Sequence, residues 1–197
     1  MEDKKDLIIR EAEKRDASVI SNYIRALAEY EGELQDVKVT PERLEEYMFD
    51  KGWAKALIAE IENKPIGFAL YHYSFSTFLG KPGIALVDLY IEPEHRNKGY
   101  GKTVLSRLAK IAVDEDFERL EWWVHDWNHD AAKRYISWGA NPIENIRVYR
   151  LTEKNLVDFS KLAKFHSKLS RTSARVWFSF SGKYCLFMNN PPMFKEL

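Results

Sequence analysis

The chain has 197 residues, of which 45% are hydrophobic and 14% aromatic, enough for one well-buried domain with room for an appendage. Its formal charge is zero, no apolar run approaches the roughly 20 residues of a membrane span, and the charged start MEDKKDL differs from a secretory signal, so we expect a cytoplasmic protein without a membrane partner. The single cysteine, Cys185, excludes internal disulfides, and the five histidines lack metal-binding spacing such as HExxH, so we expect no metal.

The start of the chain predicts a strand followed by two helices. Residues 7–12 (LIIREA) form a β-branched run typical of a strand, and Asp16 is placed to cap an amphipathic helix whose apolar residues recur at helical spacing. Thr40 followed by Pro41 predicts the start of a second, shorter helix with one buried side.

The next segments predict the centre of a sheet. Residues 56–61 and 65–75, joined by a turn at Asn63 and Lys64, are typical of an antiparallel hairpin. Residues 84–91 (IALVDLYI) predict a third central strand.

The second half of the chain continues this alternation. Residues 119–125 (RLEWWVH) are typical of a strand, and a helix is expected from Asn128 to Trp138, where Gly139 suits a left-handed C-cap. Residues 147–151 (RVYRL) predict another strand, and a last helix is expected from Thr152. Together these elements predict the α/β class with a mixed sheet.

The stretch HRNKGYGKT, residues 95–103, lies between the third central strand and an amphipathic helix. Free N–H groups at a helix N-terminus and the helix dipole both favour an anion, and Gly99 and Gly101 allow phosphate oxygens close to the backbone. Arg96 and Lys98 add positive charge. Because neither GxxxxGK[ST] nor GxGxxG is present, ATP and NAD are disfavoured as the ligand.

Two motifs at this loop and beyond it carry a family resemblance. Residues 96–101 (RNKGYG) resemble the R/Q-x-x-G-x-G/A motif with which GNAT-superfamily acetyltransferases hold the pyrophosphate of acetyl-CoA, and residues 126–140 (DWNHDAAKRYISWGA) resemble the W-N-x(6)-Y-x(3)-G-A segment of diamine acetyltransferases. Ser76 and Thr77 resemble the Ser-Thr pair of the thialysine N-ε-acetyltransferase branch, where the spermidine/spermine branch has Asp. Further similar stretches are LAEYE (27–31), KVT (38–40), GFALYHYSFSTFLGK (67–81) and LVDLYI (86–91).

The resemblance implies a GNAT-like sheet, mixed and mostly antiparallel, flanked by helices. It also implies a homodimeric enzyme that transfers the acetyl group of acetyl-CoA to a small primary amine, such as thialysine, a lysine analogue or a polyamine, by direct attack in a ternary complex. Two alternatives stay open: a protein-lysine or N-terminal acetyltransferase with the same grip on the coenzyme, and a catalytically weak acyl-CoA-binding module.

The resemblance further assigns roles to single residues. Tyr135 is the general acid for the departing CoA thiolate unless it is only a core aromatic, and the backbone near Leu89 or Tyr90 stabilises the oxyanion. The amine is expected at Tyr30, Glu31 and Asp88, although Glu31 could be merely solvated and Asp88 merely a structural hydrogen-bonding group. Asn128 is equally an N-cap. The residues expected at the coenzyme are Leu89, Tyr90, Ile91, Arg96, Asn97, Lys98, Gly99, Tyr100, Gly101, Lys102, Asn128 and Lys133.

One position departs from the family pattern. Val87 stands where the family has the glutamate implicated in deprotonating the amine. Asp88, Glu92, Glu31 or a relocated water could replace it, or the enzyme could work on the small neutral fraction of the amine and prefer alkaline pH. A weak or altered enzyme is therefore one of the interpretations.

The end of the chain fits none of these patterns. We expect a catalytic domain over residues 1–163 and an extension over residues 164–197 that is basic, since residues 159–195 contain seven Lys or Arg and no Asp or Glu. Two aromatic runs around Ser181 and Gly182 suit an added hairpin, but poor order is the preferred interpretation. The rest of the chain is acidic, which favours a cationic small substrate over nucleic acid.

Overall fold

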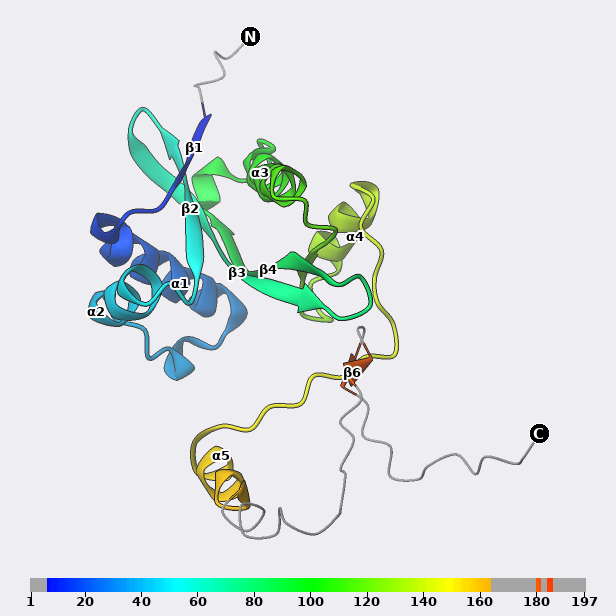
Figure 1. Ribbon diagram of the computed structural model, residues 1–197. Coiled ribbons are helices and arrows are strands. Elements are labelled where there is room, and N and C mark those ends of the chain that lie inside the picture. Colours follow the sequence, from blue (N-terminus) through cyan, green and yellow to red (C-terminus); the bar gives the residue numbers. More distant parts are fainter. Residues whose placement is uncertain (1–6, 164–179, 182–183, 186–197) are drawn as a thin grey trace, which may run out of the picture. The chain divides into compact units, whose positions relative to one another are not determined.

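The computed structural model describes residues 7–163, 180–181 and 184–185 (Figure 1). The chain forms two compact units, Met1–His125 and Asp126–Leu197, each of which is described by itself. No helix in these described ranges has both the length and the apolar character needed to cross a membrane. The domain division at residue 163 stays a prediction.

A five-stranded sheet in the order β1-β2-β3-β4-β5 forms the centre of the first unit (Figure 1). The first four strands pair antiparallel with their neighbours, whereas β5 runs parallel to β4. The α/β class with a mixed, mostly antiparallel sheet is thereby confirmed. The strands are β1 (Leu7–Glu11), β2 (Lys55–Ile61), β3 (Lys64–Ser76), β4 (Lys81–Ile91) and β5 (Leu120–Trp122).

Helices cover both faces of this sheet (Figure 1). On one face, buried residues of α1 and of the segment around α2 pack with residues such as Ile58 and Phe68. Because side chains alternate along a strand, Leu57 lies on the opposite face, where α3 buries Val104 and Leu108. The helices are α1 (Ala17–Glu31), α2 (Pro41–Leu44), which continues as the π-helical turn η3 (Glu45–Asp50), and α3 (Tyr100–Asp114).

The predicted helix starts differ in how they are capped. Thr40 caps α2 as expected, since its hydroxyl accepts a hydrogen bond of 3.3 Å from the N–H of Arg43. Asp16 lies at the N-cap of α1, but its side chain does not cap that helix. Instead it forms a salt bridge of 2.6 Å with Arg10, which also binds Glu60 at 2.7 Å. The Oδ2 atom of Asp16 also accepts a 2.7 Å hydrogen bond from the N–H of Glu13, so these partners already satisfy the buried carboxylate.

Two predicted boundaries in the first unit need correction. The β2–β3 turn lies at Glu62 and Asn63, which have φ of 53° and 59°, so β3 begins at Lys64 and the predicted turn was one residue late. The strand predicted over residues 119–125 ends at Trp122. Trp123 is 63% exposed, so the apolar run continues without the burial that would extend the strand.

The second unit contains α4 (His129–Ser137) and α5 (Glu153–Ser160). Asn128 caps α4 by accepting a 3.2 Å hydrogen bond from the N–H of Ala131, and Gly139 adopts the expected left-handed conformation with φ of 94°. The strand predicted over residues 147–151 is wrong. An alternating apolar pattern makes a strand only where a partner supplies hydrogen bonds, and none pairs with this segment among the described residues.

The extension is described at four residues only. Phe180–Ser181 (β6) pairs antiparallel with Tyr184–Cys185 (β7), at the place where the hairpin interpretation put it. The remainder of residues 164–197 lies outside the described part of the chain.

Candidate active site

A β-bulge interrupts the pairing of β3 with β4. Leu70 is opposite Asp88 and Tyr71 is opposite Leu86, so Val87 is the extra residue on β4. Its side chain is 47% exposed. Bulges bend a strand and leave a residue unpaired, and they are common beside active sites. The position where the resemblance leads us to expect a glutamate is thus a kink in the central sheet.

The bulge coincides with the end of β5. The parallel pairing of β4 with β5 stops at Leu86, opposite Trp122. Beyond it, residues 87–91 of β4 have no strand partner on that side among the described residues. Backbone donors and acceptors along such an edge are available to an extended ligand. The predicted coenzyme and oxyanion residues Leu89, Tyr90 and Ile91 lie on this edge.

The glycine loop follows directly and opens α3. Gly99 is the N-cap residue with φ of 87°, and no side chain caps the helix. A Cβ atom added at Gly99 would meet nothing within 4 Å, and one at Gly101 only Ile91 at 3.9 Å. Open space beside uncapped N–H groups of a four-turn helix fits a diphosphate. Asn97, Lys98 and Lys102 are exposed around this position, and Tyr100 is half-buried.

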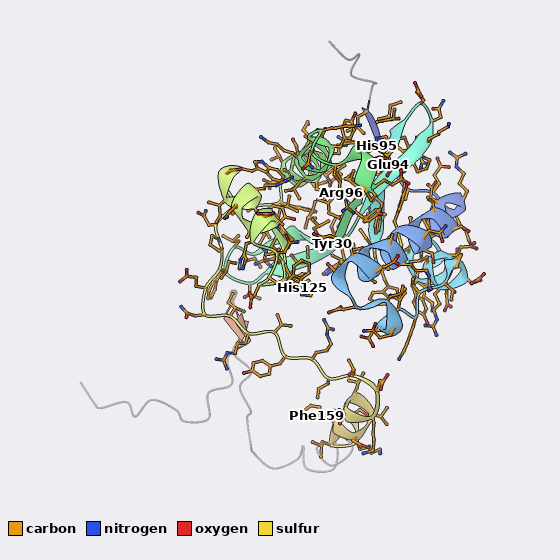
Figure 2. All side chains as sticks on the ribbon, turned by 180° about the vertical axis from the view of Figure 1, so that it is seen from behind. Tyr30, Glu94, His95, Arg96, His125 and Phe159 are labelled. Atoms are coloured by element: carbon orange, nitrogen blue, oxygen red, sulfur yellow. The ribbon has the colours of Figure 1, made fainter. Side chains whose placement is uncertain are left out.

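Arg96 lies at the start of this loop, within the first unit (Figure 2). Its Nε–H donates a 2.8 Å hydrogen bond to the carbonyl of Ile91. Its guanidinium carbon is 5.2 Å from the ring centroid of Tyr30 and 5.3 Å from that of Tyr90. The two predicted roles, coenzyme binding for Arg96 and amine binding for Tyr30, therefore fall on residues in contact with each other.

Glu92, one of the candidate replacements for the missing glutamate, already has a partner. The hydroxyl of Tyr23 donates a 3.1 Å hydrogen bond to Glu92 Oε1. Burial, followed by the charge of Glu92, raises the pKa of Tyr23 well above its ordinary value, so this hydroxyl stays a donor. The bond joins α1 to the end of β4 and favours a structural role for Glu92.

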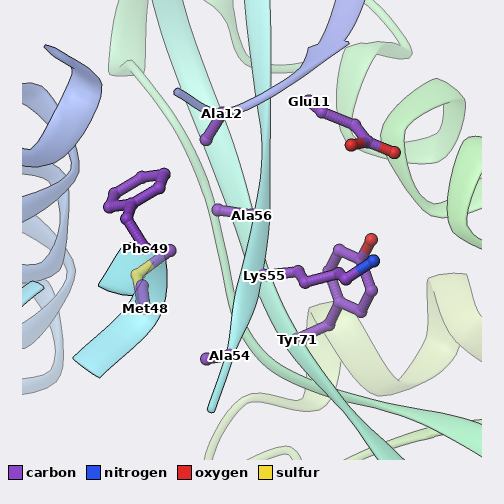
Figure 3. Close-up of a pocket in the computed structure, with 8 residues that line it drawn as sticks. All are labelled: Glu11, Ala12, Met48, Phe49, Ala54, Lys55, Ala56 and Tyr71. Carbon is purple, nitrogen blue, oxygen red and sulfur yellow. The ribbon is translucent and has the colours of Figure 1, made fainter. Parts of the chain in front are cut away.

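A small cavity of about 190 Å³ lies elsewhere in the first unit (Figure 3). It is formed where η3 approaches β1 and β2, and it contains Met48 and Phe49 on one side and Lys55 on the other. None of the residues that line it was predicted for the site. The candidate site is therefore the open edge of β4 rather than this cavity.

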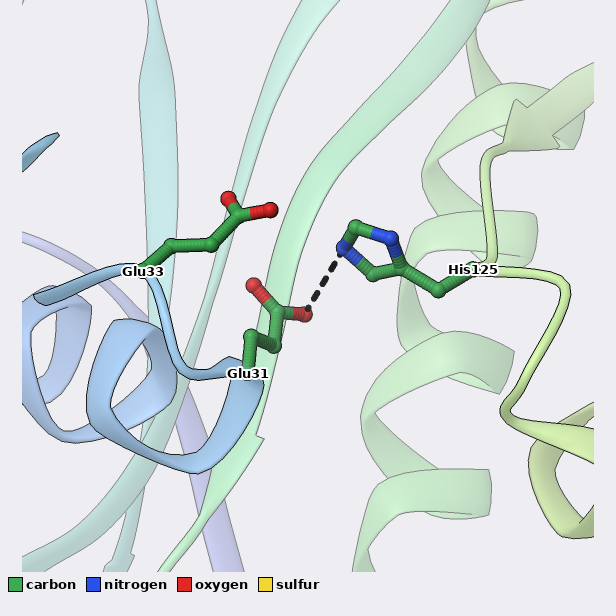
Figure 4. A group of neighbouring side chains, drawn as sticks. All are labelled: Glu31, Glu33 and His125. Carbon is green, nitrogen blue, oxygen red and sulfur yellow. Dashed lines mark ion pairs between the residues drawn. The ribbon is translucent and has the colours of Figure 1, made fainter.

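Acidic side chains gather where α1 ends beside β4. Glu31 is half-buried, and Nε2 of His125 lies 3.8 Å from its Oε1 atom (Figure 4). Burial, followed by the charge of Glu31, raises the pKa of Asp88 to about 6. Glu31 and Asp88, both predicted for the amine, are thus brought together. His125 was not predicted, since nothing in the sequence around it signals a partner near residue 31.

Three predicted residues lie on α4 of the second unit. Asn128 is the N-cap, which is the simpler of its two predicted roles, and Lys133 is exposed. Tyr135 is half-buried and packs edge-on against Trp138, with ring centroids 5.7 Å apart. Burial raises the pKa of Tyr135, which keeps its phenol protonated over a wide pH range. A protonated phenol is a group that can act as an acid.

Comparisons with known proteins identify the family. Residues 22–139 match the acetyltransferase (GNAT) family. A thialysine N-epsilon-acetyltransferase of Bos taurus is 35% identical over 146 residues, covering 70% of this chain and 85% of that protein. An L-ornithine N5-acetyltransferase of Arabidopsis thaliana is 38% identical over 96 residues, covering 49% of this chain and 42% of that protein.

A solved structure shares the fold. An integron cassette protein from the mobile metagenome of V. cholerae superimposes with a TM-score of 0.67 and 26% identity, over 79% of this chain and 98% of that one. The family match spans more than half of the chain and includes both the open edge of β4 and the glycine loop. The protein therefore belongs to the GNAT family of acetyltransferases and is an acyl-transferring enzyme.

Proposed function

We propose that the protein transfers the acetyl group of acetyl-CoA to the primary amine of a small molecule, by direct attack in a ternary complex. Thialysine, lysine, ornithine and polyamines are the amines to consider, because relatives are named for thialysine and for ornithine. A homodimer, which the family resemblance implies, and a cytoplasmic location, which the sequence composition suggests, are part of this proposal.

The observation that carries the proposal is the continuity between the free edge of β4 and the N-terminus of α3. The edge over residues 87–91 offers backbone hydrogen bonds to an extended chain, and the glycine loop that follows offers uncapped N–H groups to a diphosphate. Acetyl-CoA has both parts, an amide-containing arm and a diphosphate. Its thioester supplies the acetyl group, and Leu89 or Tyr90 would provide the N–H that stabilises the oxyanion.

The acidic side chains beside β4 support a cationic acceptor. The charge of Glu31 helps to raise the pKa of the Asp88 carboxyl group. An ammonium group placed between them would relieve the repulsion and would be held near the bulge. A neutral amine is still needed for attack on the thioester, and an alkylammonium has a pKa of about 10.4 in water. Tyr135 would protonate the departing thiolate.

The test is a steady-state assay of thiol release with acetyl-CoA and a panel of amines. Thialysine, lysine, ornithine and spermidine represent small amines, and two peptides with a lysine or a free N-terminus represent protein substrates. We expect turnover of at least one small amine, with kcat/KM at least about 10-fold above either peptide. Higher activity on the peptides would contradict the small-amine assignment.

A second candidate is a coenzyme-binding module with little catalysis, because Val87 offers no proton acceptor at the bulge. The two candidates give the same affinity for CoA, so binding alone does not separate them. Saturable CoA binding without turnover of any amine or peptide would favour the module.

A further inference from the structure

The imidazole of His125 faces glutamates from a distant part of the chain (Figure 4). Its Nε2 atom lies 3.8 Å from Oε1 of Glu31, and one polar atom from each of Glu31, Glu33 and His125 lies within 4.8 Å of the other two. Glu31 is the last residue of α1, whereas His125 follows β5. The contact therefore joins the end of a helix to the edge of the sheet.

Asp88 on β4 adds a third carboxyl group to this region. Its pKa is raised by burial and by the charge of Glu31. Burial also raises the pKa of Glu31, while the charge of His125 opposes the rise and that of Glu33 adds to it. His125 thus faces carboxyl groups from α1 and from the loop after α1, and Asp88 of β4 lies near enough to Glu31 to be affected by its charge.

The position of His125 relates it to the missing glutamate. Leu86 is the last residue of β4 that pairs with β5, and it lies opposite Trp122. Val87 is the next residue of β4. His125 comes three residues after Trp122, on the segment that leaves β4 where the bulge begins. Its side chain is less than half exposed, at 43%. His125 therefore follows β5 just after the level at which Val87, the position of the expected glutamate, bulges from β4.

The chemistry at this place requires a proton acceptor. Carboxylates attract an ammonium group but also stabilise its charged form, so they make the amine harder to deprotonate. Val87 cannot accept a proton. Histidine is the side chain whose ordinary pKa, about 6.5, suits it to take up and release protons near neutral pH.

We propose that His125 is the base that accepts the proton of the substrate ammonium, with Glu31 holding its imidazole in place. This inference rests on the acetyl transfer proposed above. Because Nε2 faces Glu31, the proton acceptor is the other ring nitrogen. An N–H bond of the ammonium breaks and its proton moves to Nδ1 of His125, which leaves the nitrogen lone pair free. The lone pair forms the C–N bond and the C–S bond breaks.

The other protons of the reaction also balance. Tyr135 donates its proton to the departing thiolate and regains one from the nitrogen as the amide forms. His125 releases its proton to solvent. The net change is one ammonium and one thioester converted to one amide, one thiol and one proton.

The experiment compares kcat/KM of the wild-type protein and His125→Gln between about pH 6.5 and about pH 10, with the best amine of the panel. We expect a loss of about 100-fold near neutral pH, which shrinks toward alkaline pH because the amine then loses its proton without help. The KM for acetyl-CoA should not change. In His125→Ala, added imidazole should restore part of the rate.

Two further variants sharpen the test. Val87→Glu introduced into His125→Gln should recover activity near neutral pH, whereas Val87→Gln should not, because only the carboxylate accepts a proton. The matched control is His72→Gln on β3, a histidine whose Nδ1 atom lies 3.2 Å from the carbonyl of Tyr73 and which has no part in the proposed site. This control should keep the wild-type pH profile.

Three results would overturn the inference. Parallel pH profiles of wild type and His125→Gln, or a loss of equal size at both ends of the range, would exclude the base while leaving acetyl transfer intact. A wild-type rate that is lost on treatment with EDTA and restored by Zn²⁺ would show that the cluster binds a metal instead. Absence of turnover with every amine would remove the proposed acetyl transfer and this inference together.

Discussion

The guanidinium carbon of Arg96 lies 5.2 Å from the ring centroid of Tyr30, so the glycine loop is held by the last turn of α1. The same guanidinium lies 5.3 Å from the ring of Tyr90 on β4, and its Nε–H binds the carbonyl of Ile91 at 2.8 Å. One side chain thereby joins three elements that border the candidate site. Its charge is also held where the loop turns toward the N-terminus of α3.

Replacing Arg96 should weaken coenzyme binding. We expect Arg96→Ala to raise the Kd for CoA about 10- to 100-fold, because the proposed role of Arg96 includes a charge-assisted hydrogen bond to a phosphate that alanine would not make. The Kd of Arg96→Lys should lie between those of the wild type and Arg96→Ala, since lysine keeps the charge but loses the planar contact with Tyr30. Isothermal titration with CoA measures the Kd of each variant. Arg107→Ala, on an exposed position of α3, is the control for lost surface charge. Unchanged affinity in Arg96→Ala would assign the arginine to stability alone.

Gly99 should be needed for both backbone conformation and phosphate approach. Its φ of 87° is unfavourable for a residue with a Cβ, so Gly99→Ala should cost about 1–2 kcal/mol of unfolding free energy and should also weaken CoA binding. Gly52→Ala is a matched control, because Gly52 has φ of 69° and an added Cβ atom would likewise meet nothing within 4 Å. Urea unfolding should show similar losses for the two variants, and only Gly99→Ala should bind CoA less tightly. Equal CoA affinity would contradict the phosphate role of this loop.

Most of the fold follows from local sequence patterns, because the strands and helices of the first unit alternate with clear periodicity. The pattern at residues 147–151 fails for a physical reason: alternating apolar residues indicate a strand, but hydrogen bonds to a neighbour decide whether one forms. Val148 is 68% exposed and Tyr149 is 88% exposed. Asp16 shows the same limit, because Arg10 competes successfully with the helix N-terminus for its carboxylate.

The candidate site is predictable to a different degree in its two halves. The glycine loop is a local motif, so Gly99, Gly101 and their neighbours could be read from the sequence. The bulge at Val87 depends on strand register, and the approach of His125 to Glu31 depends on folding of the whole first unit. Contacts between residues so far apart leave no signal in either segment.

The carboxyl group of Asp88 should make the stability of the protein depend on pH. Its pKa is raised from the ordinary 3.8 to about 6, first by burial and then by Glu31. Between these two values the unfolded chain releases the proton while the folded chain keeps it, so the free energy of unfolding falls as the pH rises through this window. We expect Asp88→Asn to be more stable than wild type above about pH 6, by about 1–3 kcal/mol.

Urea unfolding at about pH 3 and about pH 7.5 checks this expectation. The advantage of Asp88→Asn should be present at the higher pH and nearly absent at the lower one, where the wild-type carboxyl is mostly protonated in both states. Asp36→Asn, at an exposed position, should show no such difference between the two pH values. An advantage of the same size at both would mean that packing rather than ionisation separates the variants.

Tyr135 should act on the chemical step rather than on binding. Burial raises the pKa of its phenol, so the O–H remains available at the alkaline pH where the amine is more reactive. We expect Tyr135→Phe to lower kcat about 100-fold with little change in the KM for either substrate, because protonation of the thiolate occurs only after both substrates are bound.

Tyr149→Phe is the matched control in the same unit, since Tyr149 is 88% exposed and its loss of a hydroxyl should leave kcat unchanged. Circular dichroism of both variants checks that the fold is retained. If Tyr135→Phe instead raises the KM for acetyl-CoA while kcat stays at the wild-type value, the hydroxyl contributes to binding and the thiolate is protonated by another group. If neither constant changes, Tyr135 is the core aromatic that packs against Trp138 and nothing more.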